Sequence, residues 1–258
     1  MQHLERWKKE SWSTLLKTAL VRLPRAVPMG ALYITSPEGP QPFKLDLPSR
    51  KHGRSIPLYV FVPPAVFPTL ESGSATPQPS HFPVVFDYHG GGFYLGSCLE
   101  QAPFCAKLCR ELKCIVISVD YRMAPLDKFP AAIEDAEDAV KALLDPESKP
   151  GYELLRQGIA DFFRAHWLEE LEAAASKEDR KAGKVPTPPP VQIELDTTRI
   201  GFSGASSGGN IALNMGISVP ADLGLAEWPC PVPQDYKHPV PLLLLYPSLD
   251  LRQVRMFI

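Results

Sequence analysis

The chain has 258 residues, of which 45% are hydrophobic, and its formal net charge is −2 with a pI near 6.3. This length is sufficient to bury the core of one full domain. The nearly balanced charge provides no strong field that would attract nucleic acid, so we expect no nucleic-acid partner.

The N-terminal stretch has apolar residues at helical spacing over 4–23, which predicts a helix lying on the domain. A helix on a membrane surface is the alternative interpretation. No apolar run is long enough to span a bilayer, and the polar first residues do not resemble a signal peptide. We therefore expect a cytoplasmic protein without a transmembrane segment.

From residue 55 onward, apolar patterns predict strands that alternate with helices. The predicted strands are 55–62, 83–88, 114–119, 199–203 and 241–246, and the predicted helices are 97–112, 130–144 and 207–217. The run at 114–119 is continuously apolar, which is typical of a strand buried on both faces of a sheet, and 241–246 is predicted as a last buried strand. The alternation predicts an α/β domain with a mainly parallel sheet and flanking helices.

An insertion at 145–198 is longer than a simple connection requires. It contains an apolar stripe at helical spacing, formed by Leu155, Ile159, Phe162, Phe163, His166 and Leu171. The stripe fits either a lid over a pocket or a helix covering the domain edge. The preceding helix returns the chain to the amino-terminal edge of the sheet, which favours the covering helix and a core-facing rather than catalytic His166.

The five cysteines are Cys98, Cys105, Cys109, Cys114 and Cys230. Because their number is odd and no secretory signal is evident, we expect reduced thiols. Their spacing contains no C-x-x-C pair and no nearby histidine ligands, so no metal site is predicted.

Two glycine-rich motifs follow predicted strands in the order that an acyl-transfer site requires. His89-Gly90-Gly91-Gly92 follows the strand at 83–88, and Gly204-Ala205-Ser206-Ser207-Gly208 follows the strand at 199–203. The second is the G-x-S-x-G pattern of a nucleophile elbow, and the first is the H-G-G-G pattern of an oxyanion hole. G-x-S-x-G alone is a weak signal, but the pair is poorly explained by chance.

These motifs assign candidate roles to individual residues. A strand-to-helix turn would expose the Oγ of Ser206, the candidate nucleophile. The helix that begins at Ser207 directs unpaired N–H groups and a partial positive charge at the site. The N–H groups of Ser207, Gly91 and Gly92 are therefore candidate oxyanion donors, and His89 is expected to hold its loop rather than act as a base.

Taken together, several stretches resemble the hormone-sensitive-lipase-like branch of the α/β-hydrolase fold. The matching stretches are 89–93, 120–125, 129–132, 204–210 and 245–250. The resemblance implies an α/β-hydrolase that cleaves carboxylic esters of small molecules through an acyl-serine intermediate, without a cofactor. It also implies a cap-like N-terminal segment, 1–54, before a hydrolase core at 55–258 that contains the 145–198 insertion.

The sequence departs from the family pattern in three substitutions and in the rest of the catalytic triad. Ala205, Ser207 and Leu126 replace residues that are usually Asp, Ala and an acidic residue. The triad order in this fold is Ser, then Asp or Glu, then His. His238 is the only histidine after Ser206 and precedes the strand at 241–246, which places it about 20 Å away at the opposite edge of the sheet.

Asp250 follows the strand at 241–246 on the correct side and is a candidate acid or pocket residue. At least two strand–helix units, about 60–100 residues, are absent by comparison with the family pattern, so we expect a C-terminally incomplete fold. Three interpretations stay open: an incomplete copy of an esterase, a catalytically dead ligand-binding or regulatory relative, or an enzyme whose base is His89 or comes from a second chain.

Overall fold

The computed structural model describes residues 11–21, 28–63, 80–145, 149–174, 193–217 and 230–249. At its centre is a six-stranded sheet with the order β1-β2-β4-β3-β5-β6. The strands are β1 (Phe43–Pro48), β2 (Ser55–Phe61), β3 (Ser80–Tyr88), β4 (Ile115–Val119), β5 (Ile193–Ala205) and β6 (Leu242–Leu245). β4, β3, β5 and β6 are parallel, whereas β1 and β2 pair antiparallel, so the predicted mainly parallel sheet is confirmed.

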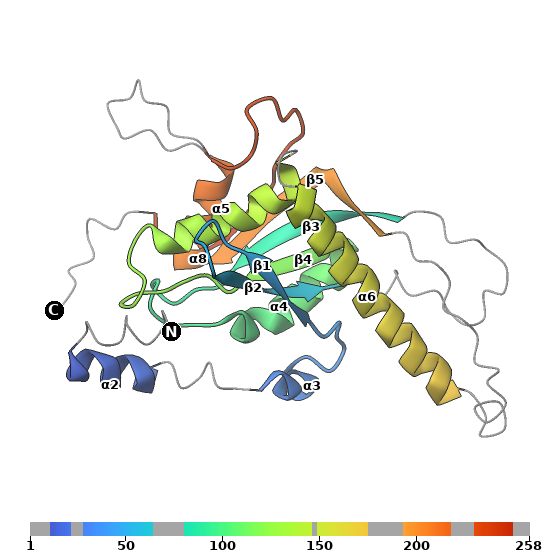
Figure 1. Ribbon diagram of the computed structural model, residues 1–258, viewed down its shortest axis with the longest axis horizontal. Coiled ribbons are helices and arrows are strands. Elements are labelled where there is room, and N and C mark those ends of the chain that lie inside the picture. The colour runs from blue at the N-terminus through green and yellow to red at the C-terminus, as the bar shows by residue number, and fades with distance from the viewer. Residues whose placement is uncertain are drawn as a thin grey trace.

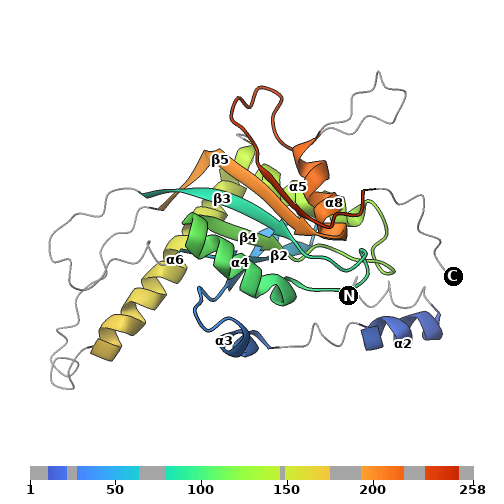
Figure 2. The same ribbon diagram turned by 180° about the vertical axis from the view of Figure 1, so that it is seen from behind.

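Helices cover both faces of this sheet (Figures 1 and 2). α4 (Cys98–Leu112) packs on β2 and β4, while α5 (Ala131–Leu144) and α8 (Ser207–Gly216) pack together on the opposite face. α2 (Trp12–Val21), η2 (Met29–Ala31) and α3 (Leu32–Thr35) belong to the N-terminal part. This arrangement puts the carboxyl ends of β3 and β5, and the loops that follow them, at the same edge of the sheet.

The core is built from the continuously apolar strands that the sequence predicted. All five residues of β4 are buried, and the inward side chains of β2 and β3 pack with them. α5 contributes alanines at 132, 136 and 139, and their small side chains let the helix approach the sheet closely. Burial of each large aliphatic side chain contributes roughly 1.5–3 kcal/mol, so this layer supplies much of the stability that holds the loops in place.

The strand β6 differs from its prediction. The apolar run at 241–246 predicted a buried strand, but Leu243 is 42% exposed and its neighbours in β6 are only half-buried. β6 pairs with β5 alone among the described residues and so forms one edge of the sheet. An apolar run predicts that a strand packs against something, but it does not identify how many neighbours the strand has.

The other edge of the sheet, β1, was not predicted as a strand. Its residues were assigned to the cap-like segment 1–54, whereas they pair with β2 over the whole length of the strand. Leu45 and Leu47 face inward while Lys44 and Asp46 are exposed, a short alternation of the kind that an edge strand requires. The division into a cap-like segment, 1–54, and a hydrolase core stays a prediction.

The insertion forms a long helix, α6 (Lys149–Ala174), that packs on α5, β1 and β5. Leu155, Ile159 and Phe163 of the predicted stripe are fully buried. Phe162 stacks on Phe43 at the start of β1 with 4.2 Å between ring centroids, and the half-buried His166 stacks on Phe162. α6 therefore covers the edge of the domain, as the sequence favoured, instead of closing over the carboxyl ends of the strands.

The five cysteines are free thiols. Among the described residues, no group of histidine, cysteine and acidic side chains is placed to hold a metal ion. Within the same residues, no helix combines the length and the hydrophobicity that crossing a membrane requires.

Candidate active site

Ser206 occupies a strained turn between β5 and α8. Its φ and ψ are 52° and −116°, a conformation that a residue with a side chain rarely adopts. The turn is held by its backbone: the Ser206 N–H donates to the Leu245 carbonyl (2.9 Å), and the Ser206 carbonyl accepts from the Asn210 and Ser248 N–H groups (both 3.1 Å). This is the strand-to-helix geometry that a G-x-S-x-G elbow needs to present its serine.

The two motif glycines allow α8 to begin directly against β3 and β5. A Cβ atom at Gly204 would overlap the Gly208 carbonyl, and one at Gly208 would overlap the carbonyl oxygens of Tyr88 and His89. Because the obstructing atoms are backbone on every side, no rotation of a side chain relieves the overlap. Glycine is therefore required at 204 and 208 for the helix to point at the turn.

Gly208→Ala is expected to destabilise the protein by about 1–3 kcal/mol or more, because β3 and α8 must separate to admit the methyl group. Urea denaturation followed by circular dichroism measures the change. Gly30→Ala is the matched control: nothing lies within 4 Å of a Cβ at Gly30, so the expected change is within about 0.5 kcal/mol. Equal stabilities of the two variants would contradict the close approach at Gly208.

The glycine-rich loop after β3 lies against this turn. A Cβ at Gly90 would stand 3.1 Å from the Ala205 carbonyl oxygen and 3.6 Å from the Ser206 Cβ. Gly91 and Gly92 have φ of 128° and 61°, and the Gly91 carbonyl accepts hydrogen bonds from the next turn of the loop. The fold therefore brings together the two motifs that the sequence singled out.

Three backbone amides were predicted to be oxyanion donors, those of Gly91, Gly92 and Ser207. Within the described part of the chain, the amides of Gly91 and Gly92 donate no hydrogen bond, and Ser207 is the first residue of α8, where helices leave N–H groups unpaired. The Ser207 hydroxyl is buried and has no partner among the described groups, so the candidate donor of this residue is its backbone amide. Their role as oxyanion donors stays a prediction.

A buried carboxylate lies beneath the loop and was not predicted. Asp87, in β3, accepts hydrogen bonds from Ser203 Oγ (2.6 Å), Ser118 Oγ (3.3 Å) and Cys105 Sγ (3.2 Å). Burial raises the pKa of Asp87, and the hydrogen bonds from these three groups oppose that rise. The Gln101 side chain connects this carboxylate to the loop: its Nε2 lies 3.4 Å from both Asp87 oxygens, and its Oε1 accepts from the Gly90 N–H at 2.8 Å.

Gln101→Leu is expected to destabilise the protein by about 1–3 kcal/mol, because it removes the acceptor of the Gly90 N–H and a donor to buried Asp87. Hydrogen exchange at the Gly90 amide should accelerate in parallel. Gln157→Leu is the control, since Gln157 makes its hydrogen bond to Asp161 on the exposed side of α6. Unchanged exchange at Gly90 in Gln101→Leu would show that the loop does not depend on this connection.

His89 is enclosed by the structure and is 1% exposed. Its Nδ1 is 2.8 Å from the Gly90 carbonyl, and its ring stacks on Tyr121 with 4.3 Å between centroids. The Tyr121 hydroxyl donates to the His89 carbonyl at 2.6 Å, and Nε2 lies 3.9 Å from an oxygen of Asp120. These contacts support a role in holding the loop.

His238 lies at the other end of the sheet, as expected. It lines a cavity of about 460 Å³ together with Pro83 and Thr198, which belong to the amino-terminal parts of β3 and β5. Asp250 lies outside the described residues. Within those residues Ser206 Oγ makes no hydrogen bond to a histidine, so the described structure forms the serine turn without a base on the serine.

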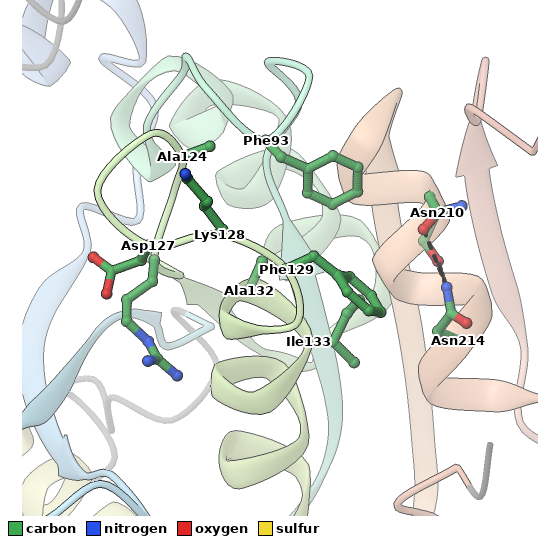
Figure 3. A pocket seen from close by; sticks show the side chains of 10 residues that line it. Phe93, Ala124, Asp127, Lys128, Phe129, Ala132, Ile133, Asn210 and Asn214 are labelled. Carbon is green, nitrogen blue, oxygen red and sulfur yellow. Dashed lines mark hydrogen bonds between the residues drawn. The ribbon is translucent and has the colours of Figure 1, made fainter. Parts of the chain in front are cut away.

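A second cavity, of about 400 Å³, opens beside the turn (Figure 3). Phe93 enters it from the glycine-rich loop, Phe129 and Ile133 line it from the start of α5, and Asn210 and Asn214 line it from α8. Asn210 is one helical turn beyond Ser206 and donates to the Ser248 carbonyl at 2.9 Å. The cavity is thus apolar on one side and carries amide groups on the other.

A strained serine turn between a parallel strand and a helix, packed against a glycine-rich loop from the neighbouring strand, is typical of the α/β-hydrolase fold. Residues 85–256, more than half of the chain, match the family model described as the alpha/beta hydrolase fold. The chain belongs to this family, and the resemblance to its hormone-sensitive-lipase-like branch is confirmed.

The relatives of the chain include esterases from several kingdoms. It is 32% identical over 146 residues to probable carboxylesterase 8 of Arabidopsis thaliana, which is 55% of this chain and 35% of that protein. It is 38% identical over 84 residues to the esterase LipI of Mycobacterium tuberculosis, covering 33% of this chain and 26% of the relative. The matches span about a third or less of these curated relatives.

Among solved structures, a hyperthermophilic esterase from the archaeon Pyrobaculum calidifontis is 28% identical. The match covers 72% of this chain and 41% of that one, with a TM-score of 0.42.

Proposed function

We propose that this protein hydrolyses carboxylic esters of small molecules through acylation of Ser206. The observation that carries the proposal is the contact between the two motifs: Gly90 packs against the Ser206 turn. On this proposal the backbone amides of Gly91, Gly92 and Ser207 are the oxyanion donors. The carboxylesterases among the relatives support the reaction class. Hydrolysis at this site requires no cofactor.

In this mechanism the Ser206 Oγ attacks the ester carbonyl carbon and gives its proton to a general base. The three amides donate to the oxygen that becomes negative, which lowers the barrier to the tetrahedral intermediate. The C–O bond to the alcohol then breaks, the alcohol leaves with a proton, and water releases the acid from the acyl-serine. The described contacts of Ser206 include no general base, so the base is a group that lies outside them. Asp250 is the candidate acid that orients this base.

The cavity beside the turn supports an ester substrate. Phe93, Phe129 and Ile133 offer an apolar wall for an acyl or alcohol group, and the adjacent Asn210 offers polar atoms. A pocket that is mostly apolar with a few polar groups is the usual form of a small-molecule site. Three charged side chains, those of Arg122, Asp127 and Lys128, also line the cavity.

A ligand-binding relative that does not turn over its ligand is the second candidate. One observation favours it: within the described residues no histidine reaches Ser206 Oγ. A serine without a base is a weak nucleophile, although the pocket and the amides would still bind a carbonyl compound.

A fluorophosphonate probe tests the proposal, because it modifies only a serine that a base has activated. We expect one label on the chain, located at Ser206 by peptide mapping, and none on Ser206→Ala. Ser207→Ala is the matched control and should retain the label, since the backbone amide is unchanged. A label that persists in Ser206→Ala contradicts the assignment, and an unlabelled wild type that binds an ester without cleaving it supports the ligand-binding candidate.

A further inference from the structure

The helix α2 presents its apolar side to solvent. Trp12, Leu16 and Leu20 are spaced four residues apart, so they form one stripe along the helix, and they are 87%, 72% and 66% exposed. Thr18, on the opposite side, is completely buried. An amphipathic helix on a globular protein normally buries its apolar stripe, and here the orientation is reversed.

Two hydrogen bonds stabilise α2 internally, and one side-chain contact joins it to the glycine-rich loop. The Ser11 hydroxyl accepts from the Thr14 N–H at 3.2 Å, a contact that satisfies an N–H group at the start of the helix. The Thr18 hydroxyl donates to the Thr14 carbonyl (2.7 Å) and lies 3.3 Å from the Tyr94 hydroxyl. Tyr94 follows Phe93 in the glycine-rich loop, so α2 is attached beside the candidate active site with its stripe facing away.

The exposed apolar surface continues beyond α2. In η2 and α3, Met29, Tyr33 and Ile34 are 41%, 69% and 85% exposed. Both views show α2 and α3 on the same side of the molecule, outside the layers formed by the sheet and its helices (Figures 1 and 2). The apolar side chains of two separate elements thus face solvent on one side of the protein.

The charge of this segment differs from that of the whole chain. Residues 1–25 contain six basic residues (Arg6, Lys8, Lys9, Lys17, Arg22 and Arg25) and two acidic ones (Glu5 and Glu10), a net charge of +4, whereas the chain as a whole carries −2. Lys17 is exposed on α2 itself. An apolar stripe with tryptophan, accompanied by basic residues, has the chemistry of a helix that lies in the headgroup region of an anionic membrane.

We propose that α2 docks on an anionic lipid surface, with Trp12, Leu16 and Leu20 inserted among the headgroups and Lys17 near the lipid phosphates. The helix lies in the plane of the surface and does not cross it. Docking involves neither Ser206 nor the amides around it, so it stands independently of the proposed reaction. Through Thr18 and Tyr94 it would hold the mouth of the candidate site at the lipid surface.

Co-sedimentation of the 258-residue chain with lipid vesicles tests this proposal. We expect binding to phosphatidylcholine–phosphatidylserine vesicles at least about tenfold stronger than to phosphatidylcholine alone, since several basic residues contribute at an anionic surface. Raising the salt concentration should reduce this difference because the charges are screened. Equal binding to the two vesicles, or binding to neither, would overturn the proposal.

The double variant Leu16→Ser/Leu20→Ser is expected to weaken vesicle binding by about tenfold or more, because both side chains leave the inserted stripe. Both residues are exposed, so the fold should be unaffected, which circular dichroism checks. Leu112→Ser is the matched control: Leu112 is 58% exposed at the end of α4, and its substitution should leave binding unchanged.

Two further measurements separate this proposal from its alternatives. Ser206→Ala should bind vesicles as the wild type does, whatever its effect on hydrolysis. Sedimentation velocity without lipid tests whether a second copy of the chain covers the stripe. Self-association that the double variant abolishes, together with unchanged vesicle binding by that variant, would assign the stripe to a protein interface and reject the lipid surface.

Discussion

Replacing Ser206 by alanine is expected to lower the rate of p-nitrophenyl acetate hydrolysis by at least about 10³-fold, because the reaction loses the atom that forms the acyl intermediate. The turn itself should persist, since its hydrogen bonds to Leu245, Asn210 and Ser248 use only backbone atoms of Ser206. The positive φ of 52° strains any residue that carries a Cβ atom, so replacing serine by alanine changes this backbone strain little. The measurement is the initial rate per mole of folded protein, with the burst of p-nitrophenol that reports acylation.

The matched control for this experiment is the adjacent serine. Ser207→Ala retains the first amide of α8 and removes only a buried hydroxyl that has no partner among the described groups, so its rate should stay close to that of the wild type. If Ser206→Ala hydrolyses the ester as fast as the wild type does, Ser206 is not the nucleophile. If wild type and variant both match the buffer, the ligand-binding candidate is favoured over the enzyme.

The elements next to the site were the most predictable part of the fold. Local patterns located β3, β4, α4 and α8 to within a few residues, since each is either a short apolar run or a periodic segment ended by glycine or proline. β5 begins at Ile193, earlier than the predicted 199, because its first residues pair with the start of β3, where Leu195 lies opposite Phe82 in the core. That pairing is a tertiary contact that no local pattern records.

The sequence predicted those features of the site that depend on backbone conformation and close backbone packing. Glycines at 91, 92, 204 and 208 mark positions where a side chain cannot fit or a positive φ is needed, and such requirements are visible in sequence. Gln101 was missed because its role depends on which elements α4 faces. One signal was available: an aspartate at 87 inside the apolar run of β3 indicates a buried carboxylate that needs donors from neighbouring elements.

Asp135→Asn is expected to destabilise the protein by about 3–5 kcal/mol, the usual effect of removing one partner from a buried ion pair. Asp135, in α5, is fully buried between two arginines. Its oxygens accept from Arg54 Nη1 and Nη2 (both 2.7 Å) and from Arg122 Nε (3.0 Å), and one also accepts from the Arg122 N–H (2.9 Å). Burial alone would lower the pKa of Arg122, but the carboxylates of Asp135 and Glu134 raise it overall. A guanidinium is not deprotonated in proteins, so neutralising Asp135 leaves a buried positive charge with one carboxylate fewer.

Urea denaturation of Asp135→Asn and of Asp161→Asn measures this effect against a control, since Asp161 pairs with Arg164 on the exposed side of α6 and should contribute about 0.2–1 kcal/mol. Similar losses in the two variants would contradict a special role for the buried pair.

The loss of the Asp135 charge should also affect the candidate site. Arg122 follows Tyr121, whose hydroxyl holds the His89 carbonyl at 2.6 Å, and the Ala124 N–H donates to the Phe93 carbonyl at 2.9 Å. We therefore expect fluorophosphonate labelling of Ser206 to slow in folded Asp135→Asn but not in Asp161→Asn, because only the first loosens the segment that supports the glycine-rich loop.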